Sequence, residues 1–279
     1  MRAVESAFRA RFAIIAAWPL ALLLAAISLG GILTNAYAKE SPAWVEQAIG
    51  QDWFDLVIAA PWIAICGVAA HHSPRWRVLL AGAYAYVVYE LFIYAFAVHF
   101  NALFLLYCAT LGLAAFALLA LVGELREDRL VIDRRGAHLG GGLLVALGVM
   151  FTLMWLVEDL PAVLTNTPPA TLVATGLFTN PVHAIDLSFV LPAHVVTGVL
   201  LWRRTQVGQL YGPIVLAFGI VMAASIGGMM VVIALIGGAA QAAVIAAMFA
   251  VVLASAAVLG RTLSGRAADP AYPSDRRAW

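Results

Sequence analysis

Eight apolar segments, each long enough to cross a lipid bilayer, constrain the fold of this chain more than any other feature. A membrane-spanning helix needs about 20 mostly apolar residues. Only helices and closed barrels satisfy their backbone hydrogen bonds inside lipid, and these segments are too long and too evenly apolar for barrel strands. The sequence therefore predicts an all-α, polytopic bundle of eight transmembrane helices, over residues 13–37, 53–71, 76–98, 102–123, 138–159, 182–202, 210–236 and 238–260.

The composition agrees with this prediction and excludes several classes of protein. Of the 279 residues, 64% are hydrophobic and 11% are charged, whereas soluble domains have roughly 45–50% and 25%. A net charge of +1 gives no basic field for nucleic acid. We expect one membrane domain over residues 1–265, a short cytoplasmic tail over 266–279, membrane lipids as partners and no binding of nucleic acid.

The distribution of arginine predicts the direction of the helices. With eight spans, 15 of the 16 basic residues fall at the two termini and in the connections after spans two, four and six, and only Lys39 lies elsewhere. Cytoplasmic loops carry an excess of Lys and Arg, so we expect both termini in the cytoplasm. Ala36-Tyr37-Ala38 resembles a signal-peptidase site, but the apolar run from Ala13 exceeds the roughly 7–15 residues of a signal peptide, which favours an uncleaved first span.

Ionisable groups within the spans are candidates for function because each costs roughly 2.5–3.5 kcal/mol on insertion scales. In the third predicted span, Glu90 lies near mid-membrane, with Tyr86 and Tyr94 one helical turn to either side and Asn101 on the continuing face. We predict that this group, together with His194 of the sixth span, contacts a ligand or forms a proton relay.

The sixth predicted span carries a narrow polar stripe. It opens with Asn180-Pro181, which is a favourable N-cap followed by proline in the first turn. His183, Asp186 and His194 then fall on one face of a helix. Pro192 removes a backbone hydrogen bond just before His194 and predicts a kink there.

A divalent metal site is one interpretation of the acids and histidines near the outer ends of the spans. His183 and Asp186 are three residues apart and could reach one zinc or iron ion, with Asp52, Asp55 or Glu90 completing the ligands. Asp52 and Asp55 could instead cap a helix start. Equally, the intramembrane acids and histidine could form a structural hydrogen-bond network between helices. The long loop between spans five and six could serve as a lid.

The seventh and eighth predicted spans, 210–236 and 238–260, contain no ionisable residue and many glycines and alanines. Small residues allow helices to approach closely. We expect this pair to act as scaffold or as the contact surface for another membrane protein.

No catalytic motif identifies a reaction. The single lysine, Lys39, lies outside the spans and offers no Schiff base for retinal. The chain has no His-Glu-x-x-His, Gly-x-Ser-x-Gly or phosphate-binding loop, and six histidines are too few for a histidine-box oxidase.

Two stretches carry a resemblance to known proteins. They are Tyr89-Glu90 through Tyr107, which includes His99-Phe100-Asn101, and Thr179 through Asp186, continuing to Leu191-Pro192. Both resemble a set of bacterial multi-pass membrane proteins of no assigned activity, and the likeness extends from the second span through the sixth. The resemblance implies a bacterial inner-membrane location and nothing about chemistry.

These observations leave four functional hypotheses. The first is an outward-facing His/carboxylate pocket that binds a small ligand or a metal ion. The others are a proton-coupled transporter, a structural or assembly subunit of a membrane complex, and an intramembrane enzyme acting on a lipid or quinone.

Overall fold

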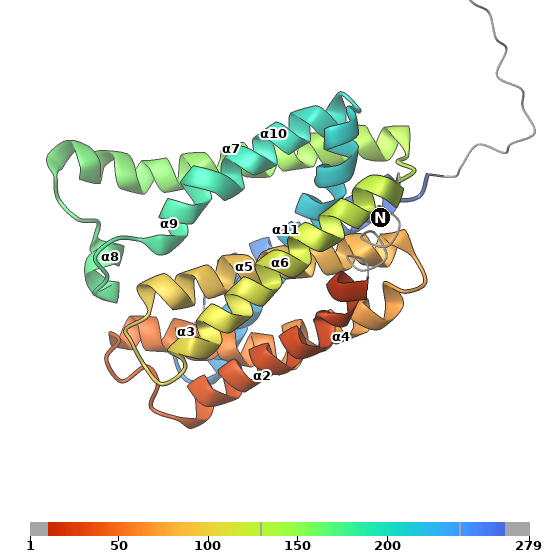
Figure 1. Ribbon diagram of the computed structural model, residues 1–279. Coiled ribbons are helices and arrows are strands. Elements are labelled where there is room, and N and C mark those ends of the chain that lie inside the picture. The colour runs from red at the N-terminus through yellow and green to blue at the C-terminus, as the bar shows by residue number, and fades with distance from the viewer. Residues whose placement is uncertain (1–10, 129, 240, 266–279) are drawn as a thin grey trace, which may run out of the picture.

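A computed structural model describes residues 11–128, 130–239 and 241–265 of the protein, which form a bundle of long helices (Figure 1). Eight of them are long and apolar enough to cross a membrane, as the sequence predicts, and the described residues contain no strand. The predicted tail over 266–279 lies outside the described residues. The spans are Arg11–Leu33, Pro42–Ala69, Pro74–Ala97, Phe104–Glu127, Arg134–Thr165, Pro181–Trp202, Gln206–Leu235 and Ala242–Thr262.

Two of the spans are interrupted by a π-helical turn. The second span consists of α3 (Pro42–Phe54), η1 (Asp55–Ala59) and α4 (Ala60–Ala69). The sixth consists of α9 (Pro181–Ile185), η2 (Asp186–Val190) and α10 (Leu191–Trp202). The other spans contain the helices α2 (Ala17–Leu33), α5 (Pro74–Ala97), α6 (Phe104–Asp128), α7 (Arg134–Thr165), α11 (Gln206–Leu235) and α12 (Ala242–Thr262).

The two interrupted spans share the sequence pattern Asp-Leu-x-x-x-x-Pro. Asp55 and Asp186 each begin a π-helical turn, and Pro61 and Pro192 each lie in the first turn of the α-helix that follows. Proline lacks an N–H group and its ring clashes with the preceding turn, so a wider turn before it relieves the conflict. The kink predicted at Pro192 is therefore a π-helical turn, and the same device occurs in the second span.

The eight spans divide into two four-helix halves of similar arrangement. In each half, the first span packs against the second and the third against the fourth. The third helices of the two halves, α5 and α11, pack against each other, and α11 also lies along α3 (Figure 1). At this junction a Cβ on Gly82 would lie 2.5 Å from the Cβ of Ala217, so the close approach requires glycine. Thus α11 acts as an internal scaffold, which is one of the two roles expected for it.

The second span begins earlier than predicted, at Pro42 instead of residue 53. The Ser41 side chain accepts a hydrogen bond from the Trp44 amide, and Pro42 occupies the first helical turn. Polar residues such as Gln47 and Gln51 lower the hydropathy of α3. Hydropathy alone therefore missed this start, because a segment with several polar residues scores like a loop even when those residues contact other helices.

The connection between the fifth and sixth spans is shorter and more ordered than predicted. Helix α7 continues past Pro161 to Thr165 and ends at Asn166, whose φ of 50° is left-handed. A short helix, α8 (Ala170–Thr175), follows and contacts α3 of the other half.

Arginines gather at one end of the bundle, where Glu124, Glu127, Asp128 and Asp133 also lie, whereas the other end carries acids and almost no basic residue. Successive spans are antiparallel, so the connections 70–73, 130–133 and 203–205 lie at one end, here named the arginine end. The predicted contributors Arg2, Arg9 and the arginines of the tail lie outside the described residues. At the opposite end, here named the acidic end, Lys39 is the only Lys or Arg among the described residues. The acids towards this end are Glu40, Glu46, Asp52, Asp55, Glu158, Asp159 and Asp186.

Candidate functional site

A cavity of about 310 Å³ lies between the two halves, within the membrane-spanning part of the bundle. Its wall combines α3 and α5 of the first half with α7, the sixth span, α11 and α12 of the second. Most of the wall is apolar, with residues such as Leu147, Val190 and Met222. Three ionisable side chains that the sequence singles out also line it, namely Glu90, Asp186 and His194. The third and sixth spans thus turn their polar residues towards one shared cavity.

Glu90 is a buried residue of the wall with an unsatisfied polar atom. The residue is only 6% exposed, yet its Oε2 atom has no hydrogen-bond partner among the described residues. Tyr86 and Tyr94, one helical turn to either side, also line the cavity. A buried polar atom without a partner costs about 1–3 kcal/mol, so this oxygen is a natural contact for a molecule in the cavity.

Behind Glu90, Asp55 is enclosed by hydrogen-bond donors. The Tyr86 hydroxyl donates to Asp55 Oδ1 over 2.5 Å, and Gln51 Nε2 lies 3.3 Å from both carboxylate oxygens. The Ser225 hydroxyl in turn donates to Gln51 Oε1 over 2.9 Å, which links α3 to α11. Asp55 is 1% exposed and does not line the cavity.

Asp52 lies in a second, neighbouring group of tyrosines. The Tyr37 hydroxyl donates to Asp52 Oδ2 over 2.8 Å, and the Tyr94 hydroxyl is 3.4 Å from Oδ1. Tyr37 belongs to the loop before α3, where burial, reinforced by the Asp52 carboxylate, raises the pKa of its hydroxyl and keeps it a donor. Asp52 and Asp55 therefore join helices at the side of the cavity instead of facing into it.

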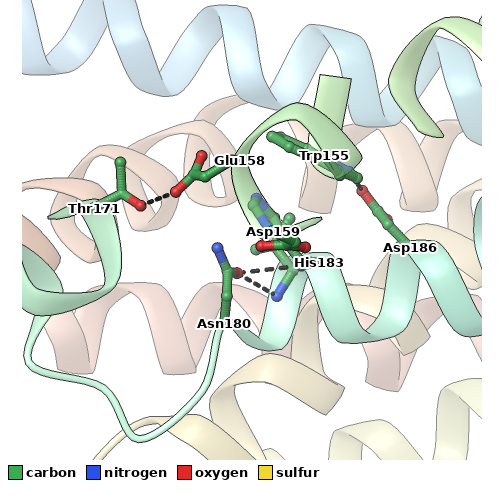
Figure 2. Close-up of polar contacts among 8 residues, drawn as sticks. Trp155, Glu158, Asp159, Thr171, Asn180, His183 and Asp186 are labelled. Carbon is green, nitrogen blue, oxygen red and sulfur yellow. Dashed lines mark hydrogen bonds and ion pairs between the residues drawn. The ribbon is translucent and has the colours of Figure 1, made fainter. Parts of the chain in front are cut away.

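In the sixth span, Trp155 of α7 separates the two residues that the sequence assigns to one metal ion (Figure 2). Its Nε1 atom donates to Asp186 Oδ2 over 2.8 Å, while its ring stacks on His183 with centroids 4.1 Å apart. His183 Nδ1 lies 3.0 Å from both carboxylate oxygens of Asp159. His183 therefore pairs with Asp159. The Asp186 carboxyl instead interacts with Trp155 and Tyr89.

These contacts do not assemble the predicted metal ligands. His183 faces Asp159, Asp186 faces Trp155, and Asp52 and Asp55 face tyrosines in the other half. In the part of the chain that the structure describes, no three His, Cys, Asp or Glu side chains are arranged to hold a metal ion. The geometry therefore gives the metal interpretation no support.

His194 presents one ring nitrogen to the cavity. Its Nδ1 atom lies 2.7 Å from the Val190 carbonyl oxygen, and since a carbonyl only accepts, Nδ1 carries the hydrogen. Nε2 is then the accepting nitrogen, and it lies beside Gly219, where a Cβ would be 3.9 Å away. Val190 closes the π-helical turn, so this irregular turn fixes the orientation of the imidazole.

Two other predicted features lie away from the cavity. Asn101 caps the turn before α6, where its Oδ1 accepts from the Leu103 amide over 2.9 Å. The expected lid, residues 160–181, contributes no side chain to the cavity wall. Instead, the Thr171 hydroxyl of α8 donates to Glu158, which ties this short helix to α7 (Figure 2).

Several residues of the wall escaped sequence analysis. Trp44 and Gln47 lie in the part of α3 that hydropathy missed, and the buried Nε1 atom of Trp44 has no hydrogen-bond partner among the described residues. Tyr89 and Ser225 also line the cavity. One sequence signal could have drawn attention to the second and sixth spans: the pattern Asp-Leu-x-x-x-x-Pro occurs in both, at the π-helical turns that interrupt them.

Comparison of the chain with protein-family models, with curated proteins and with solved structures gives no match.

Proposed function

We propose that this integral membrane protein binds a small lipophilic molecule inside the bilayer, in the cavity between its two halves. The unpartnered Oε2 atom of buried Glu90, a residue that lines this mostly apolar cavity, is the observation that carries the proposal. Ligand sites are typically concave and apolar, with a few polar groups that orient the ligand. The cavity volume of about 310 Å³ lies at the small end of such sites.

Three polar atoms would orient the bound molecule. Glu90 Oε2 and Trp44 Nε1 lack partners among the described residues, and His194 Nε2 is the free nitrogen of its ring. They come from α5, α3 and α10, so a ligand that contacts all three would bridge the two halves. We place the protein in the bacterial inner membrane, with its arginine end in the cytoplasm and the acidic end outside, following the bias of arginine.

Saturable binding of a lipophilic fluorophore tests the proposal. Aminoanthracene would be titrated into the purified protein in nanodiscs, with empty nanodiscs subtracted. Gly219 offers space beside His194, so Gly219→Trp should fill part of the cavity and abolish saturable binding. Gly112→Trp is the matched control, because nothing lies within 4 Å of a Cβ at that position.

The expected result is saturable fluorescence for the wild type and for Gly112→Trp, and a linear, unsaturable signal for Gly219→Trp. A wild-type protein that shows no saturable component would overturn the proposal. Equal binding by both variants would also overturn it, since the fluorophore would then occupy another site.

A further inference from the structure

The chemistry of the cavity wall indicates the charge of the ligand. Glu90 is 6% exposed, lines the cavity and has a carboxyl oxygen, Oε2, without a hydrogen-bond partner among the described residues. The Asp55 carboxyl behind it accepts hydrogen bonds from Tyr86 and Gln51 and does not line the cavity. Among the described residues, no lysine or arginine lines the cavity, so Glu90 has no cationic side chain beside it there.

Aromatic rings surround the carboxyl groups. Both halves of the bundle contribute these rings to the cavity wall. They belong to Trp44, Tyr86, Tyr89, Tyr94, Phe151, Trp155 and Phe218. The face of an aromatic ring attracts a cation by about 0.5–1 kcal/mol at exposed sites and about 2 kcal/mol or more when the cation is desolvated.

The charge distribution of the whole bundle favours the same sign of ligand. The acidic end carries seven Asp and Glu residues, four of them outside the buried set, against the single ammonium group of Lys39 among the described residues. That ammonium group donates to the Phe100 carbonyl over 3.3 Å and does not line the cavity. A field of one sign raises the local concentration of oppositely charged ligands.

We propose that the ligand is a small lipophilic cation, a quaternary or protonated amine, whose charge lies against Glu90 within the aromatic wall. This inference rests on the proposed function and names its ligand class. A neutral hydrocarbon would fill the same volume but would leave the buried Glu90 carboxyl without a partner, which is costly. A cation supplies an electrostatic partner for the ionised carboxyl, and its apolar substituents contact the remainder of the wall.

A pair of probes with the same shape and different charge tests the inference. Benzyltrimethylammonium and neopentylbenzene differ only in that a quaternary nitrogen replaces a quaternary carbon. Each would compete with aminoanthracene for the wild-type protein in nanodiscs, with concentrations corrected for partition into empty nanodiscs. We expect the ammonium compound to displace the fluorophore at least about tenfold more effectively, which corresponds to about 1.4 kcal/mol.

Two variants then locate the charge recognition. Glu90→Gln keeps the shape of the side chain and should reduce the advantage of the ammonium compound about tenfold, while neopentylbenzene competes as before. Glu46→Gln is the matched control, because Glu46 is exposed on α3 and does not line the cavity. It should leave both probes unaffected.

The outcomes separate the two proposals. Saturable aminoanthracene binding that neopentylbenzene displaces as well as the ammonium compound does would overturn the cation inference and leave the lipophile site intact. An ammonium preference that survives Glu90→Gln unchanged would overturn the role of Glu90. Absence of saturable fluorophore binding to the wild type would instead remove the proposed function itself.

Discussion

The two halves of the bundle place the same interrupted span in two different environments. In the first half, Asp55 begins a π-helical turn, is 1% exposed and is enclosed by Gln51 and Tyr86. In the second half, Asp186 begins the equivalent turn, is 9% exposed and forms part of the cavity wall. One local pattern therefore produces a structural carboxylate in one half and a cavity-lining carboxylate in the other. The neighbouring helices, not the motif, decide between these roles.

The junction of the halves should be the most sensitive part of the molecule. Gly82→Val would place a Cβ 2.5 Å from the Ala217 Cβ and 2.7 Å from the backbone nitrogen of Phe218. Backbone cannot move aside as a flexible side chain can, so we expect destabilisation at or above the usual overpacking cost of about 1–3 kcal/mol. Unfolding by SDS titration in mixed micelles would measure it.

Gly112→Val serves as the control for the helix propensity of valine, because a Cβ there has no neighbour within 4 Å. If Gly82→Val unfolds at the same SDS fraction as Gly112→Val, the halves do not depend on this close packing. Their description as two units joined through α5 and α11 would then need revision.

The comparison of the two aspartates can be tested by removing one donor from each. Tyr86→Phe removes the 2.5 Å hydrogen bond to Asp55, and Trp155→Phe removes the 2.8 Å hydrogen bond to Asp186. The enclosed Asp55 then keeps only the 3.3 Å contacts of Gln51, so its variant should lose more stability, by about 1–3 kcal/mol for a buried group that loses its closest donor. Asp186 borders the cavity and should lose only about 0.6–1.7 kcal/mol, as for interhelical hydrogen bonds in membranes. Unfolding by SDS titration would measure both losses of stability. A larger loss for Trp155→Phe than for Tyr86→Phe would contradict the assignment of Asp55 as the structural carboxylate and Asp186 as the cavity-lining one.

Sequence patterns predicted those parts of the fold that depend on local chemistry. Eight apolar segments predicted the eight candidate spans, and Asn180-Pro181 predicted the start of α9, where the Asn180 side chain accepts from the Val182 and His183 amides. Contacts between side chains of different helices could not be predicted from the sequence. The spacing of His183 and Asp186 allowed a shared ion, but Trp155 of another span lies between them. The early start of α3 was hidden because polar residues such as Gln47 and Gln51 lower its hydropathy, although they contact other parts of the protein.

At the arginine end, outside the spans, one carboxylate should make the stability of the protein depend on pH. Asp133 lies in the connection before α7, outside the spans, and its carboxylate accepts from the Gly136 amide over 2.8 Å. This hydrogen bond, assisted by Arg261 at 3.3 Å, lowers the pKa of the Asp133 carboxyl below its ordinary value of 3.8.

Because the pKa is lower in the folded state, the carboxylate contributes stability at pH values above the ordinary value, and this contribution is lost as the pH falls through the folded-state pKa. Asp133→Asn removes the charge but retains a side chain that caps helices well. We expect this variant to unfold at a slightly lower temperature than the wild type near neutral pH, and to lose less stability than Trp155→Phe, since the group is partly exposed to solvent. The difference should shrink as the pH is lowered towards about 3. Thermal unfolding of both proteins in detergent across this range cancels the titration of all shared carboxylates, and a difference that grows on acidification would show that the charge of Asp133 opposes folding.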